Sequence, residues 1–149
     1  AYIRQLGEEG LRAAGEDAVL AANYLLSRLG DTYQVAFDRP CMHEFVLTAA
    51  AQKRKGASAL DVAKALIDEG FHPPTVYFPL IVPEALMIEP TETEPKETLD
   101  AFADALIRIA KRVETDPASV RDAPRNAPLR RLDEVGAARK PVLRWKPQP

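Results

Sequence analysis

The stretch Ala85-Leu86-Met87-Ile88-Glu89-Pro90-Thr91-Glu92-Thr93-Glu94-Pro95 decides the fold, because it joins a strand to the clearest helix pattern in the chain. Its apolar run predicts a strand that ends at Glu89-Pro90. Beyond Pro95, a helix is predicted over residues 96–114, with acidic residues crowding its start and basic residues its end, as the helix dipole favours. We interpret the acidic run 89–94 mainly as capping of this helix and stabilisation by its dipole. The expected buried stripe of the helix is Leu99, Phe102, Ala103, Leu106, Ala110 and Val113.

Three further strands are predicted on the N-terminal side of this stretch, each a short run rich in strand-forming residues. Pro79 and Pro83 mark the residues between them as a sheet edge or a loop, because proline cannot donate to a sheet ladder. Residues 52–56 are expected to form a polar, basic connection. The three predicted strands span Thr32–Phe37, Glu44–Thr48 and Thr75–Phe78.

Two more helices are predicted in the same region. Apolar residues recur at three- and four-residue steps over residues 8–29, and Gly30 is expected to end this helix in the left-handed conformation. A shorter helix over residues 60–69 should begin with a capping box, in which Ser58 and Asp61 hydrogen-bond each other's backbone.

The order of these elements predicts an α+β fold, a small antiparallel sheet of about four strands with helices on one face. We expect residues 1–30 to be a connecting helix and residues 31–115 to be the small domain itself. Residues 116–149 carry eight Lys/Arg, four Asp/Glu and six of the thirteen prolines, which predicts a basic tail that docks on a partner domain or subunit. Disorder of this tail is the alternative.

Composition excludes several classes of protein. The chain of 149 residues is 46% hydrophobic and 28% charged, as in ordinary soluble domains. Its net charge of −2 gives no general reason to expect binding to nucleic acid. No apolar run reaches the roughly 18 residues that a membrane helix needs. The single cysteine, Cys41, permits no disulfide within the chain and is consistent with a reducing compartment.

Few residues could carry chemistry. Cys41, His43 and His72 are too few and too scattered for a typical zinc site, and nothing indicates a lowered pKa of the Cys41 thiol, so we predict no metal site and no catalytic residue. If His43 and Glu44 lie in a strand, they should point to opposite faces. His72-Pro73-Pro74 is a stiff segment that suits either a binding site or a plain connection into the next strand.

Four ordered blocks of the chain together resemble one family. They are Phe37–Leu47, Gly70–Leu80, Ala85–Asp100 and the ending that includes Arg130–Val135 and Pro141–Trp145. The chain resembles glycine dehydrogenase (decarboxylating) subunit 2, the split bacterial P-protein of the glycine cleavage system, over nearly its whole length.

The resemblance implies the C-terminal small domain of a fold-type-I pyridoxal-phosphate enzyme, which decarboxylates glycine and passes the aminomethyl group to the lipoyl arm of the H-protein. The family's cofactor lysine lies in a His-Lys-Thr context that is absent here, so the resemblance implies that this chain alone binds no cofactor and is inactive. It further implies that the full-length enzyme is cytoplasmic, acts on glycine and forms a hetero-oligomer with glycine dehydrogenase subunit 1. It implies no binding to nucleic acid or to a membrane. The expected substrate-cleft residues are Arg39, His43, His72 and Thr75.

Two other interpretations compete with this one. The chain could be a stand-alone α+β regulatory or ligand-binding module without catalysis, or an assembly fragment whose tail only holds subunits together. Because the chain opens at Ala1 and a helix pattern begins almost at once, we expect a segment cut from a longer protein.

Overall fold

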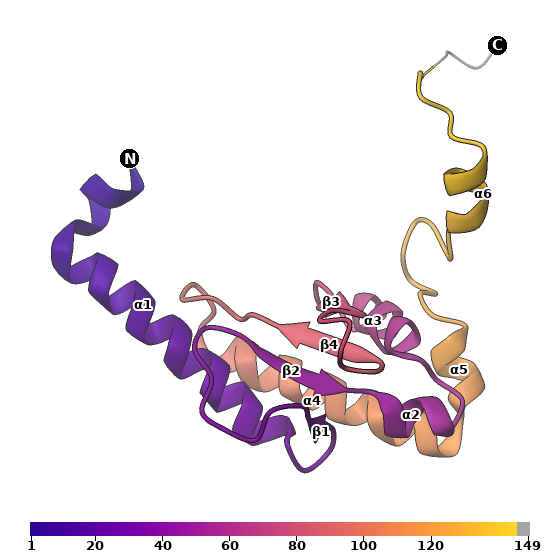
Figure 1. The fold of residues 1–149 in the computed structure, drawn as a ribbon, viewed down its shortest axis with the longest axis horizontal. Helices are drawn as coiled ribbons and strands as arrows, with labels where there is room; N and C mark the ends of the chain where they lie inside the picture. The colour runs from indigo at the N-terminus through magenta and orange to yellow at the C-terminus, as the bar shows by residue number, and fades with distance from the viewer. Residues whose placement is uncertain (146–149) are drawn as a thin grey trace.

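The computed structural model describes residues 1–145, and a four-stranded sheet with helices packed on one of its faces makes up the body of the domain (Figure 1). Within this part of the chain, none of the helices has the length and apolar character that crossing a membrane requires. The elements in chain order are α1 (Tyr2–Leu29), β1 (Gln34–Val35), β2 (Phe45–Thr48), α2 (Ala50–Arg54), α3 (Ala59–Asp68), β3 (Thr75–Val76), β4 (Ala85–Ile88), α4 (Lys96–Thr115), α5 (Pro117–Arg121) and α6 (Glu134–Arg139).

The sheet has the order β1-β2-β4-β3, and every neighbouring pair is antiparallel, which confirms the predicted fold class. On its inner face the paired residues Leu47 and Leu86 are fully buried, and in Figure 1 α4 passes behind the central strands with α1 alongside it. Because side chains alternate along a strand, the next pair, Val46 and Met87, faces the other way. We call this second side the outer face.

The predicted strands at the two edges are shorter in the structure. β1 holds only two of the six residues predicted there, and β3 only two of four. Tyr77 adopts a left-handed φ of 59°, which takes the backbone out of the extended region and ends β3. The expected connection at residues 52–56 was wrong, because residues 50–54 form helix α2, which is too short to show helical periodicity in the sequence.

Helix α1 begins earlier than predicted and ends differently. It starts at Tyr2, but Gly7 interrupts it with a non-helical φ of 66°. Gly30 ends the helix at a φ of −59°, so the prediction of a left-handed cap was wrong. Its N–H donates to the carbonyl of Leu26, which satisfies that end of the helix without a left-handed turn.

A charged cluster fixes α1 against α4. The carboxylate of Asp100 on α4 accepts hydrogen bonds from the Tyr24 hydroxyl, from Arg28 at 2.6 Å and from Lys96 at 2.6 Å. Hydrogen bonds to its charged form lower the pKa of Asp100. The Lys96 ammonium has the larger effect, and the Tyr24 hydroxyl the next. This end of α1 is therefore tied to the domain at several points.

The start of the predicted tail packs on its own domain. Helix α5 contacts α3 and α4, and Val120 and Ala123 are fully buried. The Asp68 carboxylate then accepts the N–H groups of Arg125 and Asn126 at 2.8 Å. Figure 1 shows α6 and the residues after it projecting away from the sheet. Residues 146–149 of the predicted tail lie outside the described residues, and docking of the tail on a partner stays a prediction.

The predicted capping box at the start of α3 is confirmed, and it is also joined to the tail. Asp61 accepts from the Ser58 N–H and hydroxyl at 2.7 Å each, and its other oxygen lies 2.8 Å from the Arg131 guanidinium. Burial alone would raise the pKa of Asp61, but the hydrogen bonds from Ser58 and the charge of Arg131 outweigh it and lower that pKa.

Replacing Asp61 by alanine should therefore lower the free energy of unfolding by about 1–2 kcal/mol at neutral pH. Since the folded-state pKa lies below the unfolded value, this stabilisation is present above about pH 4 and is lost as the pH falls further. Urea denaturation between pH 7 and pH 3 measures it, with Asp31→Ala as the exposed control. A gap between wild type and variant that grows towards low pH would contradict the expected sign.

Candidate functional site

Three segments converge at one end of the sheet. Phe45 at the start of β2 pairs with Ile88 at the end of β4, and Thr75 at the start of β3 pairs with Met87. The antiparallel register therefore gathers the residues just before β2, just after β4 and just before β3. Among them are His43, Glu89 and His72, which the sequence separates by up to 46 positions.

A groove of about 670 Å³ opens beside the outer face of the sheet, and Leu26 of α1 is among its lining residues. Val46 and Met87 of the outer face also line it, and the loop between β1 and β2 contributes Arg39 and His43. Two predicted substrate-cleft residues therefore line one groove. The complete lining is Leu26, Val35, Phe37, Arg39, Pro40, Cys41, Met42, His43, Glu44, Phe45, Val46, Phe78, Pro79 and Met87.

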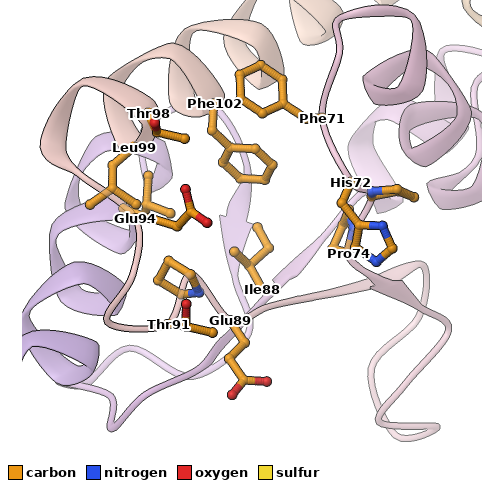
Figure 2. Close-up of a pocket in the computed structure, with 13 residues that line it drawn as sticks. Phe71, His72, Pro74, Ile88, Glu89, Thr91, Glu94, Thr98, Leu99 and Phe102 are labelled. Carbon is orange, nitrogen blue, oxygen red and sulfur yellow. The ribbon is translucent and has the colours of Figure 1, made fainter. Parts of the chain in front are cut away.

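A second cavity of about 270 Å³ lies between the end of the sheet and the start of α4. Figure 2 shows His72 and Glu94 on opposite sides of it, with Phe71 and Phe102 at one end. The two rings meet edge to face, with centroids 5.5 Å apart and an interplanar angle of 80°. The cavity is thus mainly apolar, with a few polar groups at its rim.

The two cavities meet at two side chains, His43 and Glu89, that the sequence analysis did not bring together. His43 Nε2 lies 3.9 Å from Glu89 Oε1, and Figure 2 shows the Glu89 carboxylate pointing away from the smaller cavity that this residue lines. Of the four predicted residues, Arg39 and His43 therefore share the groove and His72 lines the second cavity. Thr75 lines neither, although it lies at the same end of the sheet.

His43 and Glu44 do not lie in a strand, because β2 begins only at Phe45. The condition for their pointing to opposite faces is therefore not met, and both residues line the groove. The capping part of our interpretation of the acidic run 89–94 was wrong, while the dipole part stays a prediction. Helix α4 has Pro95 at its N-cap and no side-chain capping hydrogen bond, so this run is free for other contacts.

The acidic residues of this run have separate partners instead. Glu92 accepts a 2.8 Å hydrogen bond from the Tyr2 hydroxyl, and Glu94 lines the cavity of Figure 2. The backbone N–H of Glu92, and then Tyr2, lower the pKa of Glu92. The position of Glu89 directly after a buried strand was the signal in the sequence that could have placed it at the site.

The cysteine and histidine residues supply neither a nucleophile nor a metal centre. Burial raises the pKa of the Cys41 thiol, which keeps it in the unreactive protonated form at neutral pH. Within residues 1–145, no group of three or more His, Cys, Asp or Glu side chains could hold a metal ion. The charged and ring-nitrogen groups that line the groove are the Arg39 guanidinium, the His43 imidazole and the Glu44 carboxylate.

Comparison with known proteins identifies the family. The family model described as "Glycine dehydrogenase, C-terminal domain" matches residues 14–131. The chain belongs to this family. It is 63% identical over 97% of its length to a probable glycine dehydrogenase (decarboxylating) subunit 2 of Caldanaerobacter subterraneus subsp. tengcongensis. Identity to the protein of the same description from Bacillus thuringiensis is 58% over 99% of the chain.

The chain spans only about 30% of the length of these relatives. Among solved structures, it matches a crystal structure of glycine decarboxylase (P-protein) of the glycine cleavage system in inhibitor-bound form. The TM-score is 0.62 at 27% sequence identity, and the match covers 72% of this chain and 24% of the other. The fold is thus that of one part of a larger fold-type-I enzyme.

The residues that line these cavities do not fit pyridoxal phosphate, the cofactor of glycine dehydrogenases in general. Its anchor is a lysine whose neutral amine forms an imine. Within residues 1–145, neither of the two cavities above is lined by a lysine, and a third, beside Tyr24 and Leu20, is lined by Lys96. Hydrogen bonds from Lys96, first to Asp100 and then to Tyr24, raise its pKa and hold it as an ammonium ion. We therefore derive no chemical step on this chain through the cofactor.

Proposed function

We propose that this chain is the small domain of a glycine dehydrogenase (decarboxylating) subunit 2 and that its groove closes over the glycine site of the complete protein. The observation that carries the proposal is the position of Arg39 and His43 in one groove beside the outer face of the sheet. The length of the relatives supports it, because more than two thirds of each relative lies outside the matched segment.

In this proposal Arg39 binds the carboxylate of glycine. A guanidinium can donate two parallel hydrogen bonds to a carboxylate, which fixes both its position and its orientation. Arg39 forms no ion pair with its neighbours Asp38 and Glu44 in the structure. His43, whose Nε2 lies 3.9 Å from Glu89 Oε1, lines the same groove, while His72 and Thr75 lie outside it at the same end of the sheet.

Further parts of the proposal concern the complete protein. Pyridoxal phosphate would be held by its other domain and would supply the electron sink for decarboxylation. Glycine, glycine dehydrogenase subunit 1 and the lipoyl H-protein would be its partners, in the cytoplasm. Within the chain, residues 1–30 would connect to the other domain and residues 31–115 would form the small domain. The exposed end of the tail over residues 116–149 would dock on a partner.

The experiment compares the complete protein with residues 1–149 alone. With pyridoxal phosphate, subunit 1 and H-protein, the complete protein should exchange labelled carbon dioxide into glycine, and residues 1–149 should not. Mixing residues 1–149 with pyridoxal phosphate should also give no imine absorbance band, since Lys96, which lines the third cavity, is held as an ammonium ion. Exchange activity from residues 1–149 alone would refute the proposal.

A further inference from the structure

The loop between β3 and β4, residues 77–84, exposes an unusual amount of apolar surface. Leu80 and Ile81 at its tip are 87% and 80% exposed, and Tyr77 and Phe78 before them are exposed as well. Single exposed apolar residues are common on protein surfaces, but a contiguous group of large ones marks an interaction site.

The loop is held firmly at its base. The Thr48 hydroxyl donates to the carbonyl of Pro83 at 2.6 Å, and the Ala49 N–H donates to the carbonyl of Glu84 at 2.9 Å. The Glu84 carboxylate also accepts the N–H of Ala59, at the start of α3, at 2.7 Å. These bonds come from two different elements, so the loop cannot swing as a free hairpin.

The backbone at both ends of the loop is strained. Tyr77 and Glu84 have φ values of 59° and 50°, in the left-handed region that residues with a side chain rarely adopt. Such strain persists only where the surrounding structure imposes it, and it concentrates at functional sites. A loop fixed in this way loses little conformational freedom when it binds, which favours binding of its apolar tip.

The loop is continuous with the proposed substrate groove. Phe78 and Pro79 line that groove together with Arg39 and His43. Any domain or segment that covers the groove therefore also contacts the tip of the loop. The matched family is a C-terminal domain, which places most of the relatives' length before the matched segment and attached to it.

We propose that the tip of this loop, residues 77–82, inserts into an apolar pocket on the part of the same polypeptide that precedes the C-terminal domain, and so positions Arg39 and His43 over the substrate. The occupant is the preceding part rather than a separate chain, because a covalent link gives it an effective concentration near the millimolar range. The loop thus acts as a positioning element that touches no reacting atom. This inference rests on the proposed function of the groove.

Site-specific crosslinking in the complete protein tests the contact without relying on activity. A benzoylphenylalanine in place of Ile81 should crosslink, on illumination, to a peptide of the same polypeptide that precedes residue 1. The same group in place of Ala101, which is exposed on α4, should not. A crosslink from position 81 to another subunit, or no crosslink at all, would overturn the inference.

Activity of the complete protein tests the positioning role. The double variant Leu80→Asp/Ile81→Asp should lower kcat/KM for glycine exchange at least tenfold, because a charge enters an apolar pocket, while Ala101→Asp stays within twofold. Raising the glycine concentration should not restore the rate of the double variant, because its groove is misaligned with the substrate. A double variant within twofold of wild type, or equal losses in both variants, overturns the inference. If the wild-type protein itself lacks exchange activity, the proposed function fails, and crosslinking still decides whether the loop is docked.

Discussion

Replacing Arg39 by alanine in the complete protein should lower kcat/KM for glycine about 100-fold, which corresponds to about 2.7 kcal/mol of lost binding in the transition state. In the groove, Arg39 is the cation offered by the loop between β1 and β2, and its neighbours Asp38 and Glu44 do not neutralise it by an ion pair. Loss of its two hydrogen bonds would leave the carboxylate of glycine without a charged partner. Steady-state exchange of labelled carbon dioxide into glycine measures the effect.

Two matched variants make this result specific. Arg39→Lys keeps the charge but removes the parallel pair of donors, so it should recover only part of the loss. Arg12→Ala removes an arginine that pairs with Glu8 on the exposed surface of α1, and it should leave kcat/KM unchanged. If Arg39→Ala behaved like Arg12→Ala, the groove would not be the part of the domain that meets glycine.

Hydropathy patterns predicted the elements that form the core. The bounds of β4 and the start of α4 agree with the sequence analysis, because both elements are bracketed by proline and bury one regular face. The capping box of Ser58 and Asp61 was also predictable, since its residues are neighbours in the sequence. Patterns of this kind depend on local spacing, which the sequence records directly.

Features that depend on contacts across the fold were not predictable in this way. The pair of His43 and Glu89 requires the register of β2 against β4, which the residues themselves do not reveal. The start of helix α2 is fixed by Thr48, whose hydroxyl accepts the Ala50 N–H, rather than by an apolar repeat. The candidate site therefore lies where the sequence was least informative, in the segments between regular elements.

Replacing Leu86 by alanine should lower the free energy of unfolding of the chain by about 3 kcal/mol. Leu86 is fully buried in the central strand β4, opposite Leu47, so the shorter side chain would leave a cavity between the sheet and the helices. Its neighbour Met87 faces the groove on the outer side, and Met87→Ala should cost less than about 1 kcal/mol in the same chain. Urea denaturation followed by circular dichroism measures both values. Equal losses in the two variants would mean that both faces of the sheet are packed in residues 1–149, and the groove would then not be an open surface that awaits the rest of the protein.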